Sequence, residues 1–215
     1  MAEHILYTFR RCPYAIRARM TLAYAGINME LRELMLKDKP TDMLKHSPKG
    51  TAPVVITNKG QVIDESLDVM LWALAHNDSD DWLQELNTST ELIKINDHQF
   101  KPLLDKYKYA DRHPELTEEQ HRDNTLDFIA KLDALLQQNQ FLVSDTTGLA
   151  DIAIFPFIRQ YAFVNKSWFD QLPYQHLQRW LNHFLASELF AQIMPKFNLY
   201  NDGFRYHFPD NQLIE

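Results

Sequence analysis

The sequence is short of cysteine, of glycine and of long apolar runs. Its 215 residues include 1 Cys and 5 Gly. One cysteine excludes any internal disulfide, which suits a reducing compartment, and so little glycine is typical of a well-packed, helix-rich protein. No stretch reaches the ~18 consecutive apolar residues of a membrane span. The first residues also lack the basic and apolar segments of a secretion signal. We therefore expect a cytoplasmic protein with no membrane partner.

The sequence also has fewer basic than acidic residues. The chain has 22 Lys and Arg against 29 Asp and Glu, a formal net charge of −7. Proteins that bind a phosphate backbone need a basic surface, so we expect no nucleic-acid partner. The nine histidines are not spaced as ligands beside a cysteine or a carboxylate cluster, and we expect no metal. Basic residues gather locally beside the one cysteine, where they suit a small anion: Arg10, Arg11, Arg17 and Arg19.

Cys12 lies where a strand pattern gives way to a helix pattern. An apolar run, residues 5–9, precedes it, and Pro13 suits the first turn of a helix because it needs no N–H partner. The unpaired N–H groups of that turn and the helix dipole favour an anion. Together with the arginines they favour the thiolate, the nucleophilic form of cysteine. A lone cysteine is otherwise most often a small buried hydrophobe. Its position and its neighbours favour the reactive interpretation here.

The residue three positions after Cys12 is Ala15. A second cysteine at that position would indicate a dithiol redox site. With alanine there, any disulfide that Cys12 makes must be with another molecule.

Residues 1–76 predict a small domain in which strands and helices follow the order β-α-β-α-β-β-α. A turn containing Gly60 joins the last two strands as a hairpin, and the acids before Ser66 favour a helix start. A β-α-β unit followed by a β-β-α unit makes a mixed sheet covered by helices. The expected strands are 4–9, 29–36, 52–56 and 61–63, and the expected helices are 13–25, 41–46 and 67–75.

The rest of the chain predicts an all-helical domain. Residues 77–88 are polar and are expected to form a linker, and residues 89–215 show helical periodicity and no convincing strand. Pro102 should kink the first of these helices. The predicted fold class is therefore α+β with two domains. The expected helices are 90–109, 117–138, 150–164, 174–186 and 189–194.

Four motifs make the chain resemble cytosolic glutathione transferases of the cysteine type, the omega class and related bacterial enzymes. Their order and spacing cover the N-terminal half, and the helical half agrees in length. The resemblance implies a thioredoxin-like domain followed by an all-α domain, glutathione as co-substrate, and a homodimer. The motifs are Cys12–Ala15, Leu36–Pro40, Ser47–Val54 and the pair Glu65-Ser66.

The same resemblance implies a glutathione site around the catalytic Cys12. Glu65 would take the γ-glutamyl ammonium, and Ser66 with the helix-start N–H groups would take the adjacent carboxylate. Lys39 would meet the glycine carboxylate. The backbone before a cis-proline would pair with the cysteinyl part of the ligand. The implied glutathione-binding residues are Pro13, Tyr14, Lys39, Ala52, Pro53, Glu65 and Ser66.

Four of these residues also have an ordinary structural explanation. Glu65 with Ser66 could simply cap a helix, with an acid in its first turn. Lys39 could be a solvated surface lysine, and Pro53 an edge-strand proline.

The second substrate is expected between Cys12 and the helical domain. Candidates by position are Phe100, Tyr107, Phe155 and Arg159. Helical aromatics are more often core residues than ligand contacts, so both interpretations stand. The aromatic tail, residues 197–208, could cover the cleft or pack on the helices.

Family members often place a hydroxyl three residues before the aspartate that opens the central helix. Here Gly148 precedes Asp151, so the hydroxyl half of that capping box is absent or shifted.

The predicted activity is glutathione-dependent thiol transfer through a mixed disulfide of Cys12 with glutathione. The substrates would be glutathione and a small disulfide or electrophile. One alternative is conjugation of glutathione to small electrophiles, for which Tyr7 or Tyr14 would have to activate the thiol. Another is a non-catalytic binding module with the same fold.

Overall fold

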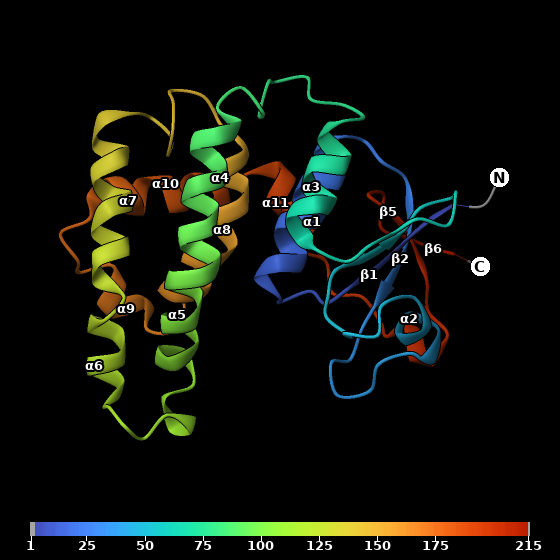
Figure 1. Cartoon of the computed structure of the whole chain (residues 1–215), viewed down its shortest axis with the longest axis horizontal. Helices are drawn as coiled ribbons and strands as arrows, with labels where there is room; N and C mark the ends of the chain where they lie inside the picture. The colour runs from blue at the N-terminus through green and yellow to red at the C-terminus, as the bar shows by residue number, and fades with distance from the viewer. Residues whose placement is uncertain (1–2, 215) are drawn as a thin grey trace. The chain divides into compact units, whose positions relative to one another are not determined.

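The computed structural model describes residues 3–214 of the chain (Figure 1). These residues form two compact units. The first contains residues 3–79 and 187–214, and the second contains residues 80–186. The first unit therefore includes both ends of the described chain. Among the described residues, no helix combines the length and the apolar character needed to cross a bilayer.

The first unit begins with the predicted β-α-β-α-β-β-α order. Its central strand β1 pairs in parallel with β2 and antiparallel with β3. The helices α1 and α3 pack against each other (Figure 1), and Met43 of α2 joins a buried cluster with Tyr7 and Val54. The thioredoxin-like fold class is confirmed. The elements are β1 (His4–Thr8), α1 (Pro13–Tyr24), β2 (Met29–Glu33), α2 (Thr41–His46), β3 (Val54–Ile56), β4 (Val62–Ile63) and α3 (Ser66–Leu74).

The chain returns to this sheet at its C-terminal end. Strand β5 (Tyr206–Phe208) pairs antiparallel with β2, and β6 (Gln212–Leu213) pairs with β5. The sheet order is β4-β3-β1-β2-β5-β6. The prediction of an all-helical segment up to residue 215 is therefore wrong for this tail. The new strands are too short to show an alternating pattern, and β5 pairs with residues far away in the sequence.

A short helix and a turn lead into these strands. Helix α11 (Glu188–Gln192) opens the tail, and Tyr200–Asp202 form a 3₁₀ turn. The hydroxyl of Tyr200 donates to Asp42, which lies in the first turn of α2, at 2.9 Å. The tail is thus fixed to the rest of the first unit by side-chain hydrogen bonds as well as by strand pairing.

The second unit is helical, as predicted, with boundaries that differ. Helix α4 begins at Leu86, inside the predicted linker, and the long helix expected over residues 117–138 is interrupted at Asn124 and Thr125. A π-helical turn, Asn96–Phe100, lies directly before Pro102, where the missing N–H breaks the regular ladder. The helices are α4 (Leu86–Ile95), α5 (Lys101–Lys108), α6 (Glu118–Asp123), α7 (Leu126–Gln138), α8 (Leu149–Ala162), α9 (Lys166–Phe169) and α10 (Gln175–Leu185), with a 3₁₀ turn at Ala110–Arg112.

Asp151 organises the start of the buried helix α8. Its carboxylate accepts hydrogen bonds from the backbone N–H of Gly148 at 3.0 Å and of Leu142 at 3.0 Å, and from the indole of Trp180 at 2.7 Å. Burial raises the pKa of Asp151 to about 6, against these hydrogen bonds. Half of the expected capping box is therefore present, because glycine has no hydroxyl to return.

Candidate active site

Cys12 is the residue immediately before the first turn of α1. Its backbone is extended, with φ −72° and ψ 124°, Pro13 follows as the first helical residue, and the side chain is partly exposed. The backbone N–H of Cys12 donates to the carbonyl of Phe9 at 3.1 Å, which turns the chain from β1 into α1. The predicted strand-to-helix junction is therefore present, and the sulfur lies at the positive end of a helix of 12 residues.

A second loop approaches the sulfur. Cys12 Sγ lies 3.6 Å from the carbonyl oxygen of Ala52 and donates a weak hydrogen bond to it. The Ala52–Pro53 peptide bond is cis, and β3 begins at the next residue. The backbone expected to pair with the ligand thus lies beside the nucleophile, although the two are 40 residues apart.

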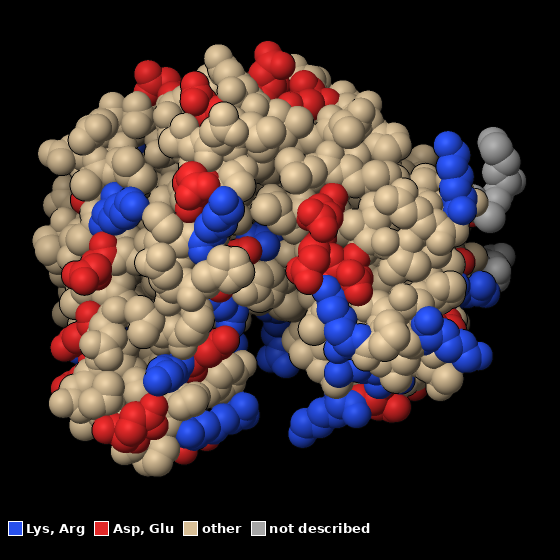
Figure 2. All heavy atoms as spheres, viewed as in Figure 1, with Lys and Arg blue, Asp and Glu red and all other residues tan. Residues whose placement is uncertain are grey.

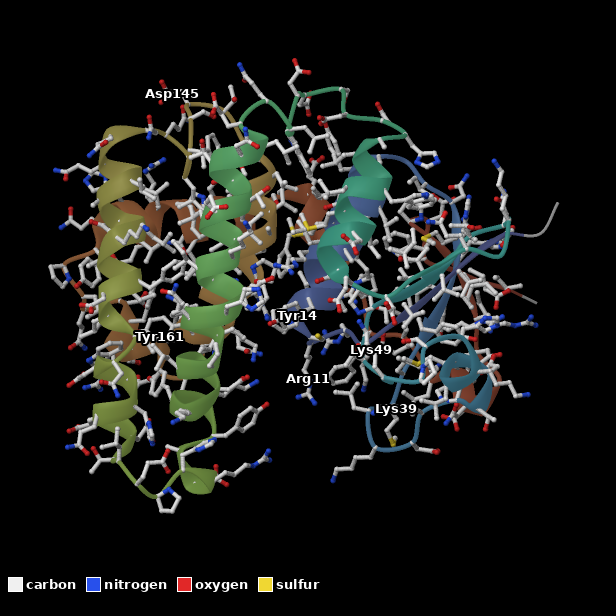
Figure 3. All side chains as sticks on the ribbon, viewed as in Figure 1. Arg11, Tyr14, Lys39, Lys49, Asp145 and Tyr161 are labelled. Atoms are coloured by element: carbon white, nitrogen blue, oxygen red, sulfur yellow. The ribbon has the colours of Figure 1, made fainter. Side chains whose placement is uncertain are left out.

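The arginines near Cys12 divide into exposed and buried ones. Arg11 is exposed and lies over the ring of Phe9 (Figure 3). Arg19 is buried, and it donates to the hydroxyl of Thr8 and to the carbonyls of Arg10 at 2.8 Å and Ile193 at 3.2 Å. Burial lowers the pKa of Arg19 to about 10, so it remains a cation at neutral pH. Arg19 therefore places a fixed positive charge behind the Cys12 loop and holds that loop to the tail.

Arg17 connects the first turns of two helices. Its side chain is buried, and its Nε donates to the hydroxyl of Ser66 at 3.0 Å. Its guanidinium also lies over the ring of Tyr14, 5.0 Å from the centroid. Because Ser66 begins α3, this contact brings the residues expected to hold the γ-glutamyl end close to the helix that carries Cys12.

Glu65 makes no helix cap with its side chain. Its carboxylate is 70% exposed and pairs with Lys49 Nζ at 2.5 Å, and the same ammonium lies 3.4 Å from Asp64 (Figure 3). The purely structural explanation of Glu65 as a capping acid is therefore not supported by the geometry. The Lys49 ammonium therefore occupies the position in which Glu65 is expected to pair with the γ-glutamyl ammonium of glutathione.

Lys39 lies in the loop between β2 and α2 and is half-buried. It packs on Gly50, which has φ +60°. A Cβ at that glycine would stand 3.2 Å from Lys39 Cδ and 3.1 Å from Leu44 Cδ2. The left-handed backbone and the close approach both require glycine there. Lys39 is thereby held against the loop that leads to Ala52.

The residues expected to meet a second substrate lie in the second unit. Phe100, Tyr107 and Phe155 are 1%, 2% and 0% exposed, respectively. Phe100 and Tyr107 pack on the ring of Tyr161, and Phe155 packs on aromatic rings of α10. Their burial favours the core interpretation. Arg159 is half-buried, with its guanidinium over Phe163.

Sequence reasoning missed the roles of Arg17, Arg19 and Lys49. The partners of Arg17 and Lys49 lie 49 and 16 residues away, and one partner of Arg19 lies 174 residues away. One available signal was the pair of arginines inside the otherwise apolar pattern of α1, because a charge at a buried position requires a partner. Among residues 3–214, no group of three or more His, Cys, Asp or Glu is placed to hold a metal ion.

Comparison with protein families identifies the chain. A family model described as "Glutathione S-transferase, N-terminal domain" matches residues 6–82, and one described as "Glutathione S-transferase, C-terminal domain" matches residues 94–188. The chain belongs to the glutathione S-transferase family. The recognition drawn from the Cys12 and Glu65 motifs is confirmed.

Two curated glutathione transferases are similar over short stretches. Glutathione S-transferase omega-1 of Mus musculus is 36% identical over 62 residues, which make up 29% of this chain and 26% of the mouse protein. A probable glutathione transferase of Aplysia californica is 42% identical over 55 residues, or 26% of this chain and 60% of that protein. The matches thus span about a quarter and three-fifths of these relatives' lengths.

The glutathione transferase fold extends over most of the chain. The glutathione transferase URE2P6 from Phanerochaete chrysosporium, solved in complex with oxidised glutathione, aligns with a TM-score of 0.77 and 19% identity. The alignment covers 89% of this chain and 94% of the fungal one. At this identity the comparison concerns the fold alone.

Proposed function

We propose that this glutathione S-transferase is a cysteine-type thiol transferase. The observation that carries the proposal is the position of Cys12, the chain's one cysteine, before the first turn of α1 and 3.6 Å from the Ala52 carbonyl. A helix N-terminus, the buried charge of Arg19 and partial exposure are the conditions that favour a reactive thiolate. Glutathione is the co-substrate in this proposal.

The reaction is a pair of thiol–disulfide exchanges. The Cys12 thiolate attacks the glutathionyl sulfur of a mixed disulfide between glutathione and a second thiol. That S–S bond breaks, and the second thiol leaves as its thiolate. A second glutathione thiolate then attacks the glutathionyl sulfur on Cys12, giving oxidised glutathione and the free Cys12 thiolate. Electrons balance without an external oxidant or reductant.

The residues around Cys12 would hold glutathione in one orientation. Glu65 would receive the γ-glutamyl ammonium, displacing Lys49. Ser66 and the start of α3 would receive the carboxylate next to that ammonium, with Arg17 fixing the serine hydroxyl. Lys39 would meet the glycine carboxylate from the loop beside Gly50. The backbone of Ala52 and Pro53, together with Pro13 and Tyr14, would line the cysteinyl part.

Conjugation of glutathione to electrophiles is the main alternative activity. It would need a hydroxyl to stabilise the glutathione thiolate. Tyr7 is 1% exposed, donates to Asp42 at 2.7 Å, and accepts from Arg32 at 2.5 Å. Burial, together with the hydrogen bond to Asp42, raises its pKa, so Tyr7 is a poor stabiliser of a neighbouring anion.

Replacing Cys12 tests the proposal directly. Cys12→Ser is nearly isosteric and should remove thiol transfer from glutathione to a small mixed disulfide, while circular dichroism and glutathione affinity stay unchanged. Conjugation of glutathione to an aryl halide should be weak in the wild type. Full thiol transfer by the serine variant would refute the proposal. A wild type that binds no glutathione at millimolar concentration would indicate a binding module instead.

A further inference from the structure

The first unit contains a pocket that the glutathione contacts proposed above do not use. Its volume is about 560 Å³, within the range of small-molecule sites. It lies where the loops that follow β1 and β2 meet the C-terminal tail. Its lining residues all belong to the first unit and come from residues 9–11, 33–37 and 196–199.

The tail forms a fixed wall of this pocket. The ring of Phe197 packs on Tyr206 of β5, with centroids 4.7 Å apart, and the N–H of Asn198 donates to the Tyr206 hydroxyl at 3.0 Å. On the other side, Arg10 donates to the carbonyl of Met194 at 3.4 Å. The wall is therefore held from β5 and from the Cys12 loop.

The pocket combines apolar walls with a cationic rim. Leu34 and Phe197 are buried, whereas Met35 and Leu36 are 46% and 43% exposed. The lining carries four cations and one carboxylate, that of Glu33, in a chain whose net charge is −7. Basic side chains gather on the lower part of the first unit in the space-filling view (Figure 2). The cationic lining residues are Arg10, Arg11, Lys37 and Lys196.

Glu33 does not cancel this rim. Its side chain is buried, and one carboxylate oxygen accepts from the backbone N–H of Arg10 at 2.8 Å. Burial raises its pKa, and the buried cation of Arg19 interacts with the same carboxylate. The charge that an entering ligand meets at the mouth therefore comes from exposed Arg11, Lys37 and Lys196.

The pocket adjoins the nucleophile along the chain. Strands β1 and β2 are parallel, so the loops that follow them emerge at the same edge of the sheet. Cys12 lies in the first of these loops, directly after Arg11, and residues 34–37 lie in the second, directly after Glu33 at the end of β2. The pocket, which Arg11 lines, therefore lies at the edge of the sheet that carries Cys12.

We infer that this pocket receives the thiol that leaves during exchange, and that it selects thiols with an apolar body and a carboxylate. The inference rests on the proposed thiol transfer. Cys12 forms its bond to the glutathionyl sulfur, the bond from that sulfur to the second thiol breaks, and the electron pair departs on the second sulfur. The cationic rim stabilises both the carboxylate and the departing thiolate, and the apolar walls bind the body.

Two aromatic mixed disulfides of glutathione test the carboxylate preference. One carries 5-thio-2-nitrobenzoate and the other 4-nitrobenzenethiolate, which are leaving groups of similar acidity that differ in the carboxylate. Both released thiolates absorb visible light, so kcat/KM follows from the same measurement at low salt, with Cys12→Ser giving the background rate. We expect the wild type to favour the carboxylate-bearing disulfide about five-fold or more. This preference should fall as ionic strength rises.

Variants of Lys196 locate the preference in the pocket. Lys196→Gln should lower the ratio of the two kcat/KM values about three-fold, and Lys196→Glu about ten-fold, as expected for exposed charge pairs. Lys45→Gln is the matched control, because Lys45 is an exposed lysine of α2 outside the pocket, and it should leave the ratio unchanged.

Equal kcat/KM values for the two disulfides in the wild type would overturn the inference while leaving the thiol transferase proposal intact. A preference that Lys196→Glu does not alter would overturn it as well. Failure of the wild type to release either thiol would instead remove the proposed function, and the inference with it.

Discussion

At the scale of single residues, Glu65 is an exposed acid that pairs with Lys49 and does not cap its helix. Glu65 immediately precedes α3, yet its carboxylate makes no hydrogen bond to the helix N–H groups and pairs with Lys49 instead. An exposed pair of this kind contributes little to stability. In the proposed function, the γ-glutamyl ammonium of glutathione replaces Lys49 at this carboxylate.

Glu65→Ala should weaken glutathione binding about ten-fold or more. The substitution leaves the ligand ammonium without its partner, and a charged hydrogen bond contributes roughly 1.5–3 kcal/mol. Titration calorimetry with glutathione measures the change. The matched control is Glu91→Ala, since Glu91 is equally exposed and pairs with Lys94 at 2.7 Å in the second unit. Equal affinity of wild type and Glu65→Ala would show that the γ-glutamyl end lies elsewhere.

Lys49→Gln should act in the opposite direction. Lys49 must leave Glu65 when the ligand ammonium arrives, and a surface pair is worth up to about 1 kcal/mol. Removing the competing ammonium should therefore tighten glutathione binding two- to five-fold in the same calorimetric titration. Weaker binding by this variant would mean that Lys49 itself contacts the ligand.

The sequence alone predicted the residues whose role is local. Cys12 with Pro13 at a helix start, and Glu65 with Ser66, are short patterns whose physics depends on neighbours along the chain. Residues that act through distant partners were missed. Arg19 looks like any helical arginine until Ile193 is found beside it, and only the fold brings them together.

At the scale of elements, helices were predicted better than strands. A helix such as α8 carries a long apolar pattern of its own, whereas β5 has three residues and depends on pairing with β2. Breaks within helices were also missed: α6 and α7 are separated by Asn124 and Thr125, which carry no strong breaker signal. Hydrophobic periodicity cannot predict elements that are very short or that form only by pairing with distant residues.

The attachment of the tail near α2 should weaken in acid. Asp42 accepts hydrogen bonds from Tyr7 at 2.7 Å and Tyr200 at 2.9 Å, and pairs with Arg32 at 2.9 Å. Burial alone would raise its pKa, but these hydrogen bonds and the Arg32 charge lower the pKa of Asp42 below its usual value. Its contribution is therefore complete above about pH 4 and is lost as pH falls through the lower, folded-state pKa.

Asp42→Asn tests this attachment. Above about pH 5 the variant should unfold more easily than the wild type by about 1–2 kcal/mol, and the difference should shrink below pH 4. Denaturant unfolding at several pH values measures it, with Asp68→Asn, a change at an exposed acid of α3, as control. A difference that persists unchanged to pH 2 would show that the carboxylate charge has no part in the attachment.

At the scale of the whole molecule, the sequence predicted two domains but assigned all residues after the linker to the second one. The first unit contains the C-terminal 28 described residues, 187–214, in addition to residues 3–79. The first unit is built from two separate segments of the chain, and no change in composition marks the start of the second segment at residue 187. The tail therefore contributes to the unit that carries Cys12, and it supplies Lys196 and Phe197 to the pocket beside the nucleophile.

We also propose that the protein is a homodimer, as the family resemblance implies. Light scattering at micromolar concentration should give twice the mass of the 25.4 kDa chain. A monomer mass at that concentration would contradict this assembly without affecting the chemistry assigned to Cys12.

The most direct test of the central claim is the intact mass of the protein after exposure to a glutathione mixed disulfide. Because the chain contains 1 Cys, a covalent adduct through sulfur can form at only one position. We predict a mass increase of one glutathionyl group in the wild type and none in Cys12→Ser, with loss of the adduct when reduced glutathione is added. A wild type that stays unmodified, or an adduct that glutathione does not remove, would contradict the account.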